Sequence, residues 1–101
     1  MEEKYLERKS YSTTEGIKED GVWKVVTTAT EERRENSESE WEVTAVSVMV
    51  YDKTFETAQK LSVGFLYNRI TEAMEKTGGT SLFELDLEEK EKDDKSETES
   101  N

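Results

Sequence analysis

Alternating apolar and polar residues predict β-strands in the first half of the chain. Residues 22–34 (VWKVVTTATEERR) are rich in β-branched and aromatic types, a composition that favours a strand. Residues 5–15 alternate more weakly and are largely polar, which is typical of an edge strand protected from aggregation. Gly16 and the pair Asp20-Gly21 predict the turn between these strands, because Asp and Gly tolerate positive φ.

Residues 40–51 (EWEVTAVSVMVY) predict a third strand, which follows a polar, turn-forming stretch at 35–39. The apolar residues of this strand change parity halfway along it. They are Trp41, Val43 and Ala45 at first, and then Val46, Val48 and Val50. Such a switch indicates either a β-bulge near Ala45 or a strand that is covered on both faces.

Residues 54–77 predict one long helix. Thr54 or Asp52 is placed to cap its start, and Gly78-Gly79 follows its last turn. At 1.5 Å per residue the helix would span roughly 35 Å, about the length of the predicted strands. The helix is therefore long enough to cross the sheet from end to end.

Residues 81–87 (SLFELDL) alternate again, with Phe83, Leu85 and Leu87 on one face. This pattern indicates a further short strand, or an extended segment that docks against a partner. The whole chain then reads as an α+β protein in the order β-β-β-α-β, with a three- to four-stranded antiparallel sheet and one long helix packed on it. We expect a single core domain over residues 1–87 and a disordered acidic tail over residues 88–101.

The tail is nearly devoid of apolar residues. From Leu87 onward it contains seven acidic residues and three lysines, a net charge of −4 out of −11 for the chain. Such a segment cannot bury enough apolar area to offset its ordering entropy. Its acidic residues are Glu88, Glu89, Glu91, Asp93, Asp94, Glu97 and Glu99. They form an inert solubilising segment, a mobile polyanion that competes with DNA for a basic groove, or a docking peptide.

The predicted helix has two apolar stripes when its residues are placed at 100° steps. One stripe contains Phe55, Ala58, Leu61 and Phe65, and the other contains Val63, Leu66, Tyr67, Ile70 and Met74. A helix on a small sheet needs only one stripe, so the second stripe is a candidate partner-binding surface. The alternative is a bend near Gly64 that lets both stripes serve one core.

Composition excludes much chemistry. The chain has no cysteine, histidine or proline, so thiol catalysis, disulfides and histidine-based catalysis are absent. No phosphate loop or metal-ligand spacing is present, and we expect neither a cofactor nor a metal site, and no enzymatic activity.

The N-terminus lacks a secretory segment and no run of residues is long and apolar enough to span a membrane, so we expect a cytoplasmic protein with no membrane partner. Abundant Glu and Lys without Cys favour a thermophilic source.

A single-stranded nucleic-acid surface would need aromatic side chains beside cations. The candidates are Tyr5, Arg8, Lys9, Tyr11, Trp23, Lys24, Arg33, Arg34 and Trp41. The alternative, which the acidic charge of the chain favours, places Trp23 and Trp41 in the core because they share a parity with Val25 and Val43.

The size, the lack of Cys and His, and the terminal run EEKEKDDKSETES resemble the small acidic-tailed accessory subunits of B-family DNA polymerases from thermophilic archaea. This resemblance implies polymerase binding, with the tail limiting strand displacement. We therefore expect a non-enzymatic subunit that binds a basic surface of a larger nucleic-acid-processing protein, with only weak or indirect contact with nucleic acid. A single-stranded DNA-binding protein with an autoinhibitory tail, and a viral DNA mimic that inhibits a nuclease, are the alternatives. A homodimer is compatible with all three.

Overall fold

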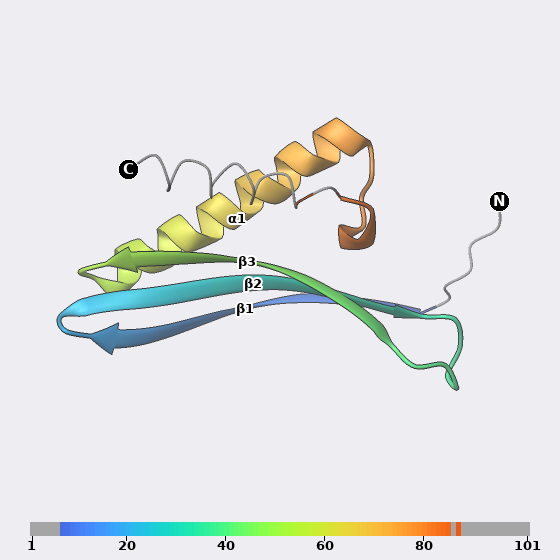
Figure 1. The fold of residues 1–101 in the computed structure, drawn as a ribbon, viewed down its shortest axis with the longest axis horizontal. Coiled ribbons are helices and arrows are strands. Elements are labelled where there is room, and N and C mark those ends of the chain that lie inside the picture. Colours follow the sequence, from blue (N-terminus) through green and yellow to red (C-terminus); the bar gives the residue numbers. More distant parts are fainter. Residues whose placement is uncertain (1–6, 86, 88–101) are drawn as a thin grey trace, which may run out of the picture.

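The protein is a three-stranded antiparallel sheet with one long helix on one of its faces (Figure 1). The computed structural model describes residues 7–85 and 87. Strands β1 (Glu7–Glu19), β2 (Val22–Arg34) and β3 (Glu42–Asp52) lie in the order β1-β2-β3, and helix α1 (Phe55–Thr77) follows them. The predicted α+β fold with an antiparallel sheet and a single helix is confirmed.

The predicted turn and cap residues lie where the chain changes direction. Asp20 and Gly21 connect β1 to β2 with φ values of 52° and 77°, the positive values that a tight hairpin requires. Thr54 caps the helix by accepting a hydrogen bond from the Thr57 amide at 3.3 Å. Gly78 ends the helix in the left-handed conformation at φ 76°, as expected for a glycine at this position.

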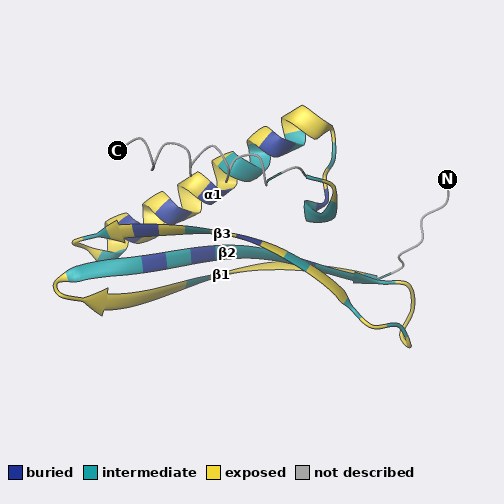
Figure 2. Cartoon of the chain, in the orientation of Figure 1, coloured by how far each residue is buried: buried dark blue, intermediate teal, exposed yellow. Residues whose placement is uncertain are grey.

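The core lies between α1 and the neighbouring strands β2 and β3 (Figure 2). Val25, Val50 and Ala58 are buried at its centre, and Trp23 and Phe55 pack against them. The Trp23 and Phe55 rings meet edge to face, with centroids 5.1 Å apart, a favoured geometry for two aromatic rings. Because this core is small, each of its large side chains carries a substantial share of the stability.

Gly16 is part of β1 rather than of a turn, which corrects the sequence-based expectation. A Cβ atom built on Gly16 would lie 2.7 Å from Cε1 of Phe55. The glycine therefore leaves room for the Phe55 ring at the edge of the core. Strand β1 continues past it to Glu19, where the Asp20-Gly21 turn begins.

The change of parity among the apolar residues of β3 comes neither from a β-bulge nor from a strand that is covered on both faces. The β2–β3 register runs without interruption from Trp23↔Asp52 to Arg33↔Glu42, so there is no bulge near Ala45. Val46 and Val50 are buried beneath the helix, whereas Val43 is exposed on the opposite face. Strand β3 thus has apolar residues on both faces, and the described part of the chain covers only one of them.

The segment after the helix forms a short 3₁₀ helix, Leu82–Glu84, instead of a strand. Its first amides bond to side chains: the Phe83 amide donates to Ser81 Oγ at 3.2 Å, and the Leu82 amide donates to Glu31 at 2.7 Å. A fourth strand would need these donors for a ladder. The local structure is therefore decided by the side-chain acceptors of Glu31 and Ser81, which the alternation of apolar and polar residues does not reveal.

Candidate interaction surfaces

The sheet face opposite the helix is left uncovered by the described residues. The helix covers one side of the sheet only (Figure 1). Large apolar side chains are exposed on the other side because strand residues alternate between faces. They are Tyr11, Ile17, Val43, Met49 and Tyr51. We call this surface the helix-free face.

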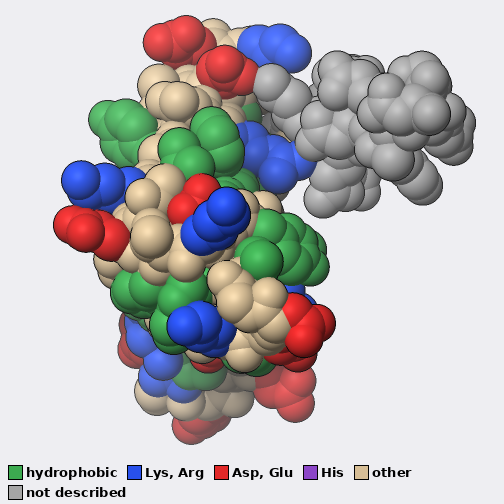
Figure 3. Space-filling model, turned by 90° about the vertical axis from the view of Figure 1, so that its left-hand side faces the viewer, with side chains coloured by type: hydrophobic (Ala, Val, Ile, Leu, Met, Phe, Trp, Pro, Cys, Tyr) green, Lys and Arg blue, Asp and Glu red, His purple; other side chains and the backbone are tan. Residues whose placement is uncertain are grey.

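Charge on the helix-free face is confined to β1 and β2. The five residues that β3 contributes are Val43, Ala45, Ser47, Met49 and Tyr51, none of which is charged. Figure 3 views the molecule from the end with the β1–β2 turn, and at this end hydrophobic side chains are interspersed with charges of both signs. Strand β3 is therefore the charge-free part of a mixed surface.

Trp41 lies beside two cations just before the start of β3. Lys9 Nζ lies 4.4 Å and Arg34 Cζ lies 4.3 Å from the centre of its ring. Each cation also has a carboxylate partner: Arg34 pairs with Glu7 at 2.7 Å and Lys9 pairs with Glu32 at 3.9 Å. The positive charge beside the indole is locally compensated.

Tyr11 is joined to the same group of charges. Its hydroxyl donates a 2.5 Å hydrogen bond to the Glu32 carboxylate. This hydrogen bond, followed by partial desolvation and the negative charge of Glu32, raises the pKa of Tyr11 above its ordinary value of 10.0. Tyr11 stays a neutral hydrogen-bond donor at physiological pH.

The structure divides the predicted nucleic-acid surface between two faces of the sheet. Pairing in both hairpins joins odd-numbered residues of one strand to even-numbered residues of the next. Lys9, Tyr11, Lys24, Arg34 and Trp41 therefore belong to the helix-free side, and Arg8, Trp23 and Arg33 belong to the helix side. Tyr5 is outside the described residues.

Placing Trp41 in the core was wrong. Trp23 does pack against the core. Val43, whose parity Trp41 shares, is exposed, and Trp41 itself is half-buried beside Lys9 and Arg34. A shared odd parity in neighbouring antiparallel strands does not imply a shared face unless the register is known.

The predicted helix stripe spans buried and exposed positions. Leu66 is buried against the sheet, Ile70 and Met74 are half-buried, and Val63 and Tyr67 are exposed. The buried line runs between the two predicted stripes, through Ala58, Ser62, Leu66 and Ala73. Ser62 was missed because it is polar.

A chain of hydroxyl groups makes the burial of Ser62 possible. Ser62 Oγ lies 2.7 Å from Thr27 Oγ1, and Thr27 Oγ1 lies 3.1 Å from Thr14 Oγ1. Ser62 also donates to the Gln59 carbonyl at 3.1 Å. These contacts satisfy buried polar atoms that would otherwise destabilise the fold.

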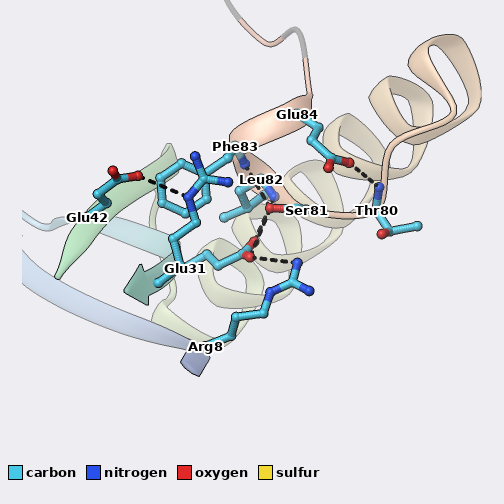
Figure 4. Close-up of polar contacts among 9 residues, drawn as sticks. Arg8, Glu31, Glu42, Thr80, Ser81, Leu82, Phe83 and Glu84 are labelled. Carbon is cyan, nitrogen blue, oxygen red and sulfur yellow. Dashed lines mark hydrogen bonds and ion pairs between the residues drawn. The ribbon is translucent and has the colours of Figure 1, made fainter. Parts of the chain in front are cut away.

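A buried carboxylate, Glu31, attaches the C-terminal segment to the sheet (Figure 4). Glu31 is only 7% exposed. It accepts hydrogen bonds from Ser81 Oγ at 2.9 Å and from the Leu82 amide at 2.7 Å, and Arg8 lies 3.5 Å from it. Nearby, the Arg33 guanidinium stacks 3.9 Å from the Phe83 ring centre. These contacts hold the 3₁₀ helix Leu82–Glu84 against the sheet.

Sequence reasoning missed this anchor, although one signal was present. Glu31 falls on the same parity as Val25 and Thr27 in the predicted strand, and an inward-pointing carboxylate in a strand needs a partner. The acidic tail residues Glu88 to Glu99 lie outside the described residues.

No protein-family model, no curated protein and no solved structure matches the chain. The resemblance to accessory subunits of archaeal polymerases therefore stays a prediction. Among residues 7–85 and 87, no group of three or more acidic, histidine or cysteine side chains is arranged to hold a metal ion. Within the same residues, no helix has the length and apolar character needed to cross a membrane.

Proposed function

We propose that the protein is a non-enzymatic accessory subunit of a larger nucleic-acid-processing protein, with a DNA polymerase as the first candidate partner. The observation that carries the proposal is the charge-free surface of β3. Val43, Met49 and Tyr51 are 59%, 51% and 61% exposed there, on the face away from the helix. Exposed apolar patches mark interaction sites, and Tyr and Met are enriched at interface cores whereas charged residues are depleted.

The net charge of −11 supports a partner with a basic surface. Proteins that hold DNA have such a surface in their binding groove. In the proposed complex the folded part docks through the helix-free face, and the seven acidic residues between Glu88 and Glu99 enter or border that groove. Their negative charge would compete with the DNA backbone and so limit how the partner handles a displaced strand.

Direct binding of single-stranded nucleic acid is a second candidate, because Trp41 lies beside Lys9 and Arg34. An indole next to two cations is a suitable stacking platform. Both cations already pair with Glu32 and Glu7, so binding of a phosphate would compete with these carboxylates. The compensated cations beside Trp41 count against the single-strand-binding function. The charge-free surface of β3 favours the protein-binding function.

An affinity capture from the source cells tests the proposal. The tagged full-length chain should recover a replication, repair or transcription protein, and Met49→Asp should lose that partner, because a charge would then be buried in the interface. Tyr67→Asp is the matched control, since Tyr67 is 70% exposed on the helix rather than on the sheet. Capture that survives Met49→Asp but fails with Tyr67→Asp would move the partner site to the helix.

Fluorescence anisotropy with single-stranded DNA at low salt separates the second candidate. The accessory-subunit proposal expects no binding by the full-length chain or by a chain that ends at residue 86. Binding that strengthens when residues 87–101 are removed, and that is lost in Trp41→Ala, would support the single-strand-binding function instead.

A further inference from the structure

The outer edge of β1 is exposed. Eleven of its thirteen residues are exposed, and the helix packs on β2 and β3. Among residues 7–85 and 87, no strand pairs with this edge. In an edge strand, the backbone N–H and C=O groups of each residue point either to the neighbouring strand or outward. A strand of this length therefore leaves a row of outward N–H and C=O groups without a partner strand.

Strand β1 lacks two features that block many edge strands, a proline and a β-bulge, although charged residues such as Lys9 and Lys18 remain on it. The chain has no proline. The β1–β2 register is continuous from Glu7↔Arg34 to Glu19↔Val22, so no bulge twists the edge away. A long, regular and open edge is a template for another strand.

We propose that two copies of this chain pair antiparallel through their β1 edges, with Thr14 at the two-fold axis. This register places Tyr11 of one copy opposite Ile17 of the other, and Lys9 opposite Glu19. Tyr11 and Ile17 are 47% and 54% exposed in the single chain and would cover each other as a cross-strand pair. Two-fold symmetry produces each of these pairs twice.

The neighbouring registers are less favourable. An axis at Thr13 places Glu7 opposite Glu19 and Arg8 opposite Lys18, which are like-charge pairs. An axis at Glu15 places this carboxylate opposite its own copy, and an axis at Ser12 places Ile17 opposite Glu7. Like charges directly opposite one another destabilise a strand pair, so charge and apolar complementarity together select Thr14.

The dimer would be one continuous six-stranded sheet in the order β3-β2-β1-β1-β2-β3. Both helices would lie on the same side, because residues opposite one another in an antiparallel pair point to the same face. The two helix-free faces would join into one surface, with the Tyr11–Ile17 pairs at the centre. This inference concerns the purified chain alone and does not depend on the proposed function.

Sedimentation equilibrium of the full-length chain tests the association. We expect twice the monomer mass of 11.7 kDa. Ile17→Lys should weaken the dimer at least ten-fold, because it replaces the Ile17–Tyr11 contact with a charge, and its far-ultraviolet circular dichroism should match that of the parent chain. A monomer mass at every concentration up to the millimolar range would overturn the proposal.

Single cysteines test the register, since the chain has none of its own. In the Thr14 register the two Thr14 Cα atoms would be roughly 4.5–5.5 Å apart, within reach of a disulfide. The two Ser12 Cα atoms would be separated by four residue steps, roughly 13 Å. Thr14→Cys should therefore cross-link at least ten-fold faster than Ser12→Cys under mild oxidation.

Exposure alone predicts the opposite order of rates. Ser12 is exposed and Thr14 is half-buried, so random collision of monomers would oxidise Ser12→Cys at least as fast as Thr14→Cys. Equal rates, or faster cross-linking of Ser12→Cys, would contradict the Thr14 register.

Discussion

Glu31 and Ser81 are fifty positions apart in the chain, yet the Ser81 hydroxyl donates a 2.9 Å hydrogen bond to the Glu31 carboxylate. The backbone amide of the next residue, Leu82, donates to the other carboxylate oxygen at 2.7 Å. One side chain thus joins the middle strand to the segment that precedes the acidic residues.

Replacing Glu31 with Ala should lower the free energy of unfolding by about 1–3 kcal/mol, because it leaves buried hydrogen-bond donors without an acceptor. Ser81, one of these donors, is 2% exposed. Urea unfolding measures the loss, and hydrogen exchange at the Leu82 amide should accelerate. Glu15→Ala is the matched control, since Glu15 is exposed on β1, and it should change stability by less than about 0.5 kcal/mol. Equal losses in the two variants would contradict the anchoring role.

The elements could be predicted from the sequence because their signals are local. Residues 22–34 were predicted as a strand with the bounds that β2 has, and the helix start and end followed from Thr54 and Gly78. Capping and turn residues act through bonds to residues two to four positions away. Such short-range bonds are readable without knowledge of the fold.

The surfaces were less predictable because they depend on register and on distant partners. Whether Trp41 shares a face with Trp23 depends on how β2 pairs with β3. The burial of Ser62 depends on Thr27 across the core, and the 3₁₀ helix depends on Glu31. The apolar residues at both odd and even positions of β3 predicted two apolar faces. They did not predict that one of these faces lies outside the folded core.

The contact between Gly16 and Phe55 predicts opposite effects for two glycine substitutions. Gly16→Ala should destabilise the protein by about 1–3 kcal/mol, as overpacking usually does, because the new methyl group would lie 2.7 Å from Phe55 Cε1. In Gly64→Ala the new methyl group has no atom within 4 Å other than those of its chain neighbours and the nearby helix backbone. It should stabilise the helix by roughly 0.5–1 kcal/mol through its higher helix propensity. Thermal unfolding followed by circular dichroism measures both effects.

A smaller side chain at position 55 tests whether the Phe55 ring causes the destabilisation by Gly16→Ala. In a chain that already carries Phe55→Leu, the methyl group of Gly16→Ala should cost less than in the parent chain, because the ring that it would contact is gone. An undiminished cost would place the strain in the backbone of β1 instead.

The two tryptophans should differ in their contribution to stability. Trp23 packs against Phe55 and the core, so Trp23→Ala should cost about 3–5 kcal/mol. Trp41 contacts Lys9 and Arg34 on the helix-free side. Its two cation–π contacts are each worth roughly 0.5–1 kcal/mol, so Trp41→Ala should cost about 1–2 kcal/mol. Urea denaturation of the two variants under the same conditions gives the comparison, and a larger loss for Trp41→Ala would show that this indole is part of the core.

The hydrogen bond from Tyr11 to Glu32 predicts a pH effect with a definite sign. The folded chain holds the phenol proton more tightly than the unfolded chain does, since the pKa of Tyr11 is raised above 10.0. The stabilisation is therefore fully present below pH 10 and is lost as the pH rises through the raised pKa. Glu32→Gln should lower the pKa of Tyr11 toward 10.0, because the hydrogen bond to a carboxylate, the largest cause of the shift, is weakened and the negative charge that opposes ionisation is gone.

Ultraviolet titration of tyrosinate measures this pKa in a chain whose other tyrosines, Tyr5, Tyr51 and Tyr67, are replaced by Phe. Glu15→Gln is the control, because Glu15 is an exposed acid on the same strand as Tyr11 and four residue steps, roughly 13 Å, away from it. It should leave the pKa of Tyr11 unchanged. If Glu32→Gln and Glu15→Gln gave the same titration curve, the raised pKa could not come from the contact with Glu32, and the charge arrangement beside Trp41 would need another explanation.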